Sequence, residues 1–144
     1  MTTEYLIRLP WPPAKTSKNG SQADFQGKAR AAKSYKAQCA WACIAQAVRK
    51  LNPAPVGNIA VTITYHPPKG GRVDWDNMAA RAKQGFDAVS EAIGVDDGRW
   101  WPVISDKGDP VPGGAVVVHV NSAEAGQWQA IGDIAKSMIK GTVA

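Results

Sequence analysis

The sequence predicts an α/β fold of the α+β type, in which one mixed β-sheet is flanked by helices in the order β-α-β-α-β-β-α. Two observations carry this prediction. The stretch 58–66 alternates apolar and polar residues, as a half-buried strand does, and the stretch 76–93 repeats apolar residues with the period of a helix. A chain of 144 residues that is 44% apolar is large enough to build one hydrophobic core. We therefore expect a single domain spanning residues 1–144.

The N-terminal third is predicted to hold one strand and one long helix. The strand is "EYLIRL" (4–9), because Tyr5, Ile7 and Leu9 share one face. The following "PWPPAKTSKNGSQ" is too rich in proline and turn residues for regular structure. Across 24–51 apolar residues recur at helical spacing and predict a stripe that faces the core: Ala37, Trp41, Ile44 and Val48.

The rest of the chain is predicted to hold three strands and two helices. "NIAVTITYH" (58–66) is the first strand, and "PPKGG" ends it. The helix 76–93 stops at Gly94 and has an apolar stripe formed by Met78, Ala82, Gly85, Val89 and Ile93. The strands at about 101–106 and 114–120 are joined by "KGDPVPGG", which predicts an antiparallel hairpin. An amphipathic segment at about 123–140 is predicted to form the last helix, with Trp128, Ile131, Ala135 and Met138 on its apolar face.

The positive charge of the chain, net +5, is concentrated in its first third. Residues 1–50 contain nine Lys and Arg against two acids, whereas residues 51–144 contain eight against ten. This asymmetry predicts a polyanionic partner, and nucleic acid is favoured over a membrane because no basic amphipathic helix with a Trp/Leu face accompanies it. The alternative is that the charge only keeps the protein soluble.

Cysteine content and hydropathy favour a reduced compartment. Cys39 and Cys43 lie four residues apart on the predicted first helix, which suits small core residues better than a disulfide framework or a zinc site. No apolar run approaches the roughly 20 residues that a membrane helix requires, and the N-terminal residues do not resemble a signal peptide. We therefore expect a cytoplasmic protein that does not enter a membrane.

Two acidic pairs flank the helix at 76–93. Asp74 and Asp76 stand at its start, and Asp96 and Asp97 follow its end. Each has an ordinary structural explanation, for instance Asp76 as the helix N-cap and Asp74 as a turn former. Four carboxylates around one helix nevertheless suit Mg²⁺, which is held by one or two carboxylates, water and substrate phosphate. The spacing does not fit an EF-hand loop, because Gly85 stands where that loop needs a glutamate.

The length of this helix separates the two pairs. A helix over 77–93 is roughly 25 Å long, so one chain brings both pairs to one metal only if its backbone folds back sharply. A two-fold dimer with antiparallel copies of the helix would instead form two composite sites. The sequence thus predicts a homodimer with shared metal sites.

With these residues in view, the chain resembles the RusA family of Holliday junction resolvases, which are small dimeric Mg²⁺-dependent endonucleases that cut four-way DNA junctions. The matching segments follow in family order over about residues 5–105: "IRLPWPP" (7–13), "RVDWDN" (72–77), "KQGFDA" (83–88) and "GVDD" (94–97). The predicted helix at 123–140 has no counterpart in this pattern.

The resemblance implies a catalytic set of Asp74, Asp76, Lys83 and Asp97. Asp74, Asp76 and Asp97 match metal-binding aspartates, Lys83 matches the active-site lysine, and Asp96 is a reserve metal ligand. It also implies Mg²⁺ as cofactor, branched DNA as substrate, and a role in DNA recombination and repair.

The residues that we expect to contact DNA are mostly basic and lie near these segments: Lys15, Lys18, Asn19, Lys28, Arg30, Lys33, Arg72 and Arg99. Trp11 and Trp75 stand beside loops where they could stack on bases, although core or interface packing is the preferred interpretation for most of the six tryptophans. The alternative function is a non-catalytic DNA- or junction-binding protein of the same fold, in which the carboxylates are only caps and turn formers.

Overall fold

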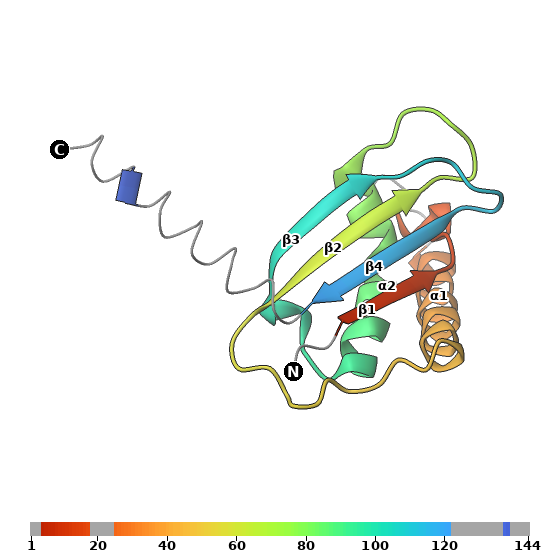
Figure 1. Cartoon of the computed structure of the whole chain (residues 1–144). Coiled ribbons are helices and arrows are strands. Elements are labelled where there is room, and N and C mark those ends of the chain that lie inside the picture. Colours follow the sequence, from red (N-terminus) through yellow and green to blue (C-terminus); the bar gives the residue numbers. More distant parts are fainter. Residues whose placement is uncertain (1–3, 18–24, 122–136, 139–144) are drawn as a thin grey trace.

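Four strands form one mixed sheet in the order β1-β4-β2-β3 (Figure 1). The computed structural model describes residues 4–17, 25–121 and 137–138. The strands are β1 (Glu4–Leu9), β2 (Ile59–His66), β3 (Trp100–Lys107) and β4 (Ala115–Asn121). Antiparallel pairs join β1 to β4 and β4 to β2, and a parallel pair joins β2 to β3. The predicted α+β domain with a mixed sheet is confirmed.

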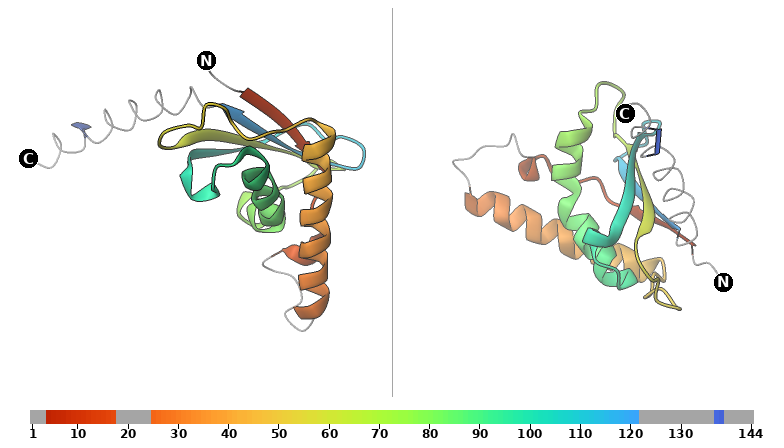
Figure 2. Two further views of the ribbon diagram at one scale, coloured as in Figure 1. Left: turned by 90° about the horizontal axis from the view of Figure 1, so that it is seen from below. Right: turned by 90° about the vertical axis from the view of Figure 1, so that its left-hand side faces the viewer.

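Two α-helices, α1 (Phe25–Ala45) and α2 (Trp75–Ile93), lie on the same face of the sheet (Figure 2). Two short 3₁₀ turns accompany them, η1 (Ala14–Thr16) and η2 (Asp97–Arg99). None of the described helices has the length and apolar character needed to cross a bilayer. The helix predicted at 123–140 lies outside the described residues except for 137–138, which are helical.

The predicted hairpin between the last two strands is wrong, because β2 lies between β3 and β4. The valines of β4 explain this arrangement. Val116, Val118 and Val120 are fully buried and suit a central strand, whereas β3 exposes most of its residues and suits an edge. The connection between the two strands is bonded to the end of β2, where Gly108 N donates to Tyr65 O over 2.9 Å.

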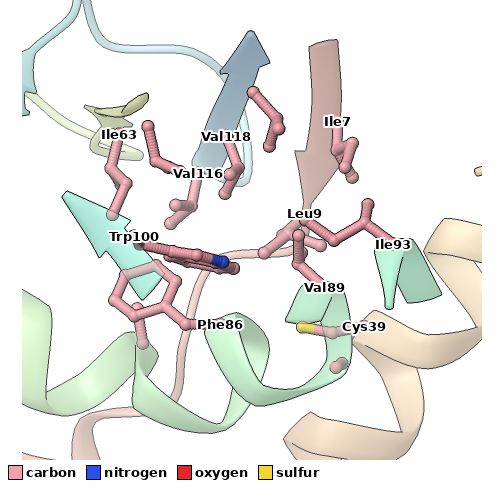
Figure 3. Packing of buried hydrophobic residues seen from close by; sticks show 14 of the residues in the cluster. Ile7, Leu9, Cys39, Ile63, Phe86, Val89, Ile93, Trp100, Val116 and Val118 are labelled. Atoms are coloured by element: carbon pink, nitrogen blue, oxygen red, sulfur yellow. The ribbon is translucent and has the colours of Figure 1, made fainter. Parts of the chain in front are cut away.

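The core lies between the sheet and the two helices (Figure 3). Ile7 and Leu9 of β1, with Val116 and Val118 of β4, face Val89 and Ile93 of α2. Trp100 is buried beside Phe86, and the two rings meet edge to face with centroids 6.2 Å apart.

Helix α2 has the buried face that its sequence predicts. Met78, Ala82, Gly85, Val89 and Ile93 are all buried. Gly94 ends the helix in the left-handed conformation with φ 73°, which is the usual glycine stop.

Helix α1 buries a different face from the one predicted. Trp41 and Ile44 are 70% and 66% exposed, while Tyr35, Cys39 and Cys43 are buried. The reason is the close contact of α1 with α2, where Gly85 leaves room for Tyr35 and Cys39. A Cβ added to Gly85 would lie 3.2 Å from Cys39 Sγ and 3.1 Å from Tyr35 Cε2. The two free cysteines are small core residues, as predicted. The helix also ends at Ala45 rather than near residue 51.

The tryptophans test one part of the preferred interpretation, packing in the core. Among the described residues, Trp100 lies in the core and Trp11 is partly buried against it, but Trp41, Trp75 and Trp101 are each at least 66% exposed. Packing in the core of this chain is therefore excluded for these three, and packing at an interface between chains stays a prediction.

Candidate functional site

Asp74 and Asp76 are exposed at the start of α2. Asp74 is the N-cap, since its Oδ1 accepts hydrogen bonds from the backbone N–H groups of Asp76 (3.2 Å) and Asn77 (3.4 Å). The prediction from the sequence that Asp76 is the N-cap of this helix is therefore wrong. Asp76 stands in the first turn, where a negative charge also interacts favourably with the helix dipole.

Lys83 lies between two carboxylates. Its Nζ donates to Asp87 Oδ1 over 3.1 Å and to Asp97 Oδ2. The hydrogen bond to Asp97 has the largest effect and raises the pKa of Lys83 above its ordinary value of 10.5; burial opposes this shift, and the hydrogen bond to Asp87 adds a smaller raising effect. Lys83 is therefore an ammonium group at neutral pH, which suits it to stabilise negative charge and not to act as a base.

The chain after α2 folds back along the helix. Gly94 reverses its direction, and Asp97, the first residue of η2, reaches Lys83 in the middle of α2. The helix is so long that the chain must reverse sharply to bring a later acidic residue back along it. Such a reversal does occur for Asp97. Lys83 and Asp76 are seven residues apart, or about 10 Å along the helix axis. Asp96 is exposed, and its side chain does not cap η2.

A cleft of about 490 Å³ separates α1 from the first half of α2, and we call it the interhelical cleft. Small side chains leave room for it at Ala32, Ala79 and Ala80. Its charged and polar lining consists of Thr16, Lys28, Asp76, Lys83 and Gln84. Two of the predicted catalytic residues and one predicted DNA contact thus share one concave surface.

The proline-rich segment at 10–17 is fastened to α2 beside this cleft. Arg81 Nη2 donates to Pro12 O over 2.7 Å, and its guanidinium lies 5.6 Å from the centroid of the Trp11 ring. Thr16 Oγ1 donates to Arg81 O over 2.9 Å, and Ser17 bonds Asn77. This role of Arg81 was not predicted from the sequence. The signal for it was the run of prolines, whose carbonyl groups need donors from elsewhere in the chain.

The other predicted DNA contacts fall into three groups. Lys15 on η1, Arg30 and Lys33 on α1 and Arg72 before α2 are all exposed. Lys18 and Asn19 lie outside the described residues. Arg99 has a structural role, since its Nε donates to Gly57 O over 2.9 Å and its Nη2 bonds the carbonyl oxygens of Pro55 and Gly57.

The carboxylates at the start of α2 suit a hard divalent cation in chemical type. Mg²⁺ takes oxygen ligands and commonly uses only one or two protein carboxylates. Within residues 4–17, 25–121 and 137–138, no group of three or more His, Cys, Asp or Glu side chains could hold a metal ion. Asp74 and Asp76 can therefore supply part of a ligand set, which water, substrate or a second chain would have to complete.

The chain has a distant relative among known proteins. The chain is 28% identical over 103 residues to a protein of Xylella fastidiosa (strain Temecula1) that carries the name "Uncharacterized protein". The match covers 70% of this chain and 67% of that protein. No protein-family model matches the chain. These findings assign neither a family nor an activity.

Proposed function

We propose that the protein is a Mg²⁺-dependent, structure-specific DNA endonuclease that resolves four-way (Holliday) junctions in recombination and repair, in the manner of the RusA family. The observation that supports this best is the interhelical cleft. Asp76 and Lys83 line it together with Lys28, and Asp97 is hydrogen-bonded to Lys83. An acidic group for a metal and two ammonium groups for phosphate thus occur along one accessible surface.

Asp74 and Asp76 are the residues that would hold Mg²⁺, with Asp97 as a third ligand and Asp96 in reserve. When bound, the cation would offset the negative charge of the scissile phosphate and polarise it for attack by water. In the hydrolysis, the oxygen of a water molecule forms a bond to phosphorus and the bond from phosphorus to O3′ breaks. The water loses a proton, and the departing oxygen gains one.

Lys83 would stabilise the charge that develops on the phosphoryl or departing oxygen. Its ammonium group is compact and rotatable, and its side chain is 53% exposed, so it can reach a phosphate at the cleft. In the free protein Asp87 and Asp97 hold it in place. A phosphate oxygen would replace one of these carboxylates as the acceptor.

The basic residues around the cleft would supply most of the affinity for DNA. Lys15, Lys28, Arg30, Lys33 and Arg72 can neutralise phosphates, and each neutralised phosphate releases counterions. Binding is therefore expected to weaken steeply as the salt concentration rises. Arg99 is left out of this surface because its guanidinium binds backbone carbonyls.

A homodimer would complete the metal site. The described residues of one chain contain no group of three metal-binding side chains, and a second copy related by a two-fold axis could contribute the missing ligands. Analytical ultracentrifugation at micromolar concentration should show a dimer. A protein that is entirely monomeric and still cuts junctions in a metal-dependent manner would contradict the composite site.

The second candidate is a non-catalytic protein that binds DNA junctions. The satisfied hydrogen bonds of Asp74 and Lys83 favour it, because each has a sufficient structural explanation as a cap or an ion pair.

A labelled four-way junction incubated with the protein, with and without Mg²⁺, separates the two candidates. We expect cleavage only with Mg²⁺, and we expect Asp74→Asn to bind the junction without cutting it. A wild-type protein that binds the junction and leaves it intact under every condition would favour the second candidate.

A further inference from the structure

A second cleft, of about 350 Å³, opens between the start of α2 and the edge strand β3, and we call it the strand-end cleft. It lies where the parallel strands β2 and β3 end, which is a common position for ligands in β-α-β units. Its lining residues are Tyr65, Val73, Trp75, Ser105, Asp106 and Lys107. A neighbouring depression shares Val73 and Trp75 and adds Arg72 and Asp74. The two hollows are therefore contiguous and reach the first candidate metal ligand.

Tyr65, which lines the strand-end cleft, has a buried hydroxyl group. The residue is 2% exposed, and its hydroxyl is buried without a hydrogen-bond partner among the described residues. Burial raises the pKa of Tyr65 to about 12, so the hydroxyl is neutral and can donate. The Ser105 side chain lies near enough to oppose this shift, but the two groups do not meet the geometry of a hydrogen bond. Because buried polar groups nearly always form hydrogen bonds, we expect the Tyr65 hydroxyl to bond a group outside the described residues.

The walls of the strand-end cleft suit a flat, partly polar ligand. Trp75 offers a large aromatic surface that is 66% exposed, and Val73 adds an apolar contact. Ser105 and Asp106 provide a polar edge. Lys107 Nζ donates to Gly71 O over 2.7 Å and so ties the loop before α2 to β3.

We propose that the strand-end cleft binds one unpaired DNA base next to the scissile phosphate. The base would stack on Trp75, and its polar edge would bond the hydroxyl of Tyr65 and the side chains of Ser105 or Asp106. The phosphate of the same nucleotide would lie in the neighbouring depression, near Arg72 and Asp74. Because the hydroxyl is covered in the free protein, binding includes a shift of an exposed side chain beside it, Trp75 or Ser105. This inference rests on the proposed function and adds a recognition step to it.

The binding test uses the full-length protein and deoxynucleoside 5′-monophosphates as probes. The indole N–H resonance of Trp75, assigned with Trp75→Phe, should shift in a saturable way at millimolar concentration of at least one nucleotide. Deoxyribose 5-phosphate, which has no base, should leave it unchanged. Trp101→Ala is the matched control, because Trp101 is equally exposed at 68% and lies outside the cleft, and it should bind as the wild type does. No shift with any of the four nucleotides, or an equal shift with the base-free sugar phosphate, would overturn the proposal.

The substitution Tyr65→Phe tests the role of the hydroxyl. If the group serves a ligand, its removal should weaken nucleotide binding by about tenfold, which corresponds to a lost hydrogen bond. The midpoint of thermal unfolding should stay the same or rise, because an unpaired buried hydroxyl is lost. A lower midpoint with unchanged nucleotide binding would show a structural role and contradict the proposal.

The binding test does not depend on cleavage. A protein that binds nucleotides in this way but never cuts a junction would refute the proposed function and leave the base site intact. A protein that cuts junctions with Mg²⁺ and shows no response of Trp75 would refute the base site alone.

Discussion

The two halves of α2 differ in what they contribute to the molecule. The first half, from Trp75 to Lys83, presents charged and aromatic side chains to two clefts. The second half places Phe86, Val89 and Ile93 in the core. One helix thus holds the candidate site rigidly, because its buried face, which includes Met78 and Ala82 in the first half, packs in the core. It follows that substitutions of the buried residues in the second half should affect stability, and substitutions of the exposed residues in the first half should mainly affect function.

The largest effect is expected in the core half. Phe86→Ala should lower the free energy of unfolding by about 3–5 kcal/mol, because it leaves a cavity beside Trp100 and removes their edge-to-face contact. Urea denaturation measures this loss. Phe86→Leu, which keeps most of the volume, should cost under about 2 kcal/mol. Equal losses for the two variants would show that the site is not tightly packed.

In the exposed half, Lys83→Met should reduce junction cleavage by about 10²–10³-fold, the range for loss of one electrostatic donor. Its free energy of unfolding should change by less than about 1 kcal/mol, because the ion pairs of Lys83 are partly exposed. Lys36→Met is the matched control, since Lys36 pairs with Glu91 on the second half of the same helix at 2.8 Å. If both variants cut equally well, Lys83 has no special role.

A smaller effect distinguishes the two carboxylates at the start of α2. Asp74→Ala should lower the free energy of unfolding by about 1 kcal/mol, because it removes the N-cap. Asp76→Ala should lower it by only about 0.3–0.5 kcal/mol through loss of the dipole interaction. Thermal and urea unfolding of both variants give the comparison. A larger loss for Asp76→Ala would contradict the assignment of Asp74 as the cap.

The smallest effect concerns pH. Because the pKa of Lys83 is raised in the folded state, its ion pairs stabilise the fold fully below its ordinary pKa of 10.5, and this contribution is lost as pH rises through the folded value. The difference in unfolding free energy between wild type and Lys83→Met should therefore be constant from neutral pH to about pH 10 and shrink above it. Burial also raises the pKa of Cys39 to about 12, which makes the fold less stable at alkaline pH. This loss of stability is the same in wild type and Lys83→Met, so it cancels in the difference. A difference that changes between pH 6 and 9 would point to another group.

The sequence predicted α2 better than the elements whose placement depends on distant partners. The apolar stripe from Met78 to Ile93 forms one continuous buried face, so the helical period of the sequence was enough to predict it. In α1 the residues Trp41 and Ile44 are exposed, whereas Tyr35 and Cys39 are buried against Gly85 of α2. This contact involves a distant helix, and no local period encodes it.

The same limit applies to the sheet and to the candidate site. The position of β2 between β3 and β4 depends on pairing across the chain, which a loop sequence alone does not specify. For the site, the pair Lys83 and Asp87 could be predicted from its spacing, but the return of Asp97 to Lys83 depends on the reversal after Gly94.

The central claim is that the carboxylates at the start of α2 serve catalysis rather than only the helix. The most direct test compares wild type and Asp76→Asn in single-turnover cleavage of a labelled four-way junction, with unfolding recorded on the same samples. We predict that the wild type cuts only with Mg²⁺, whereas Asp76→Asn binds the junction, unfolds within about 3 °C of the wild type and does not cut. Cleavage by Asp76→Asn at the wild-type rate would contradict the claim.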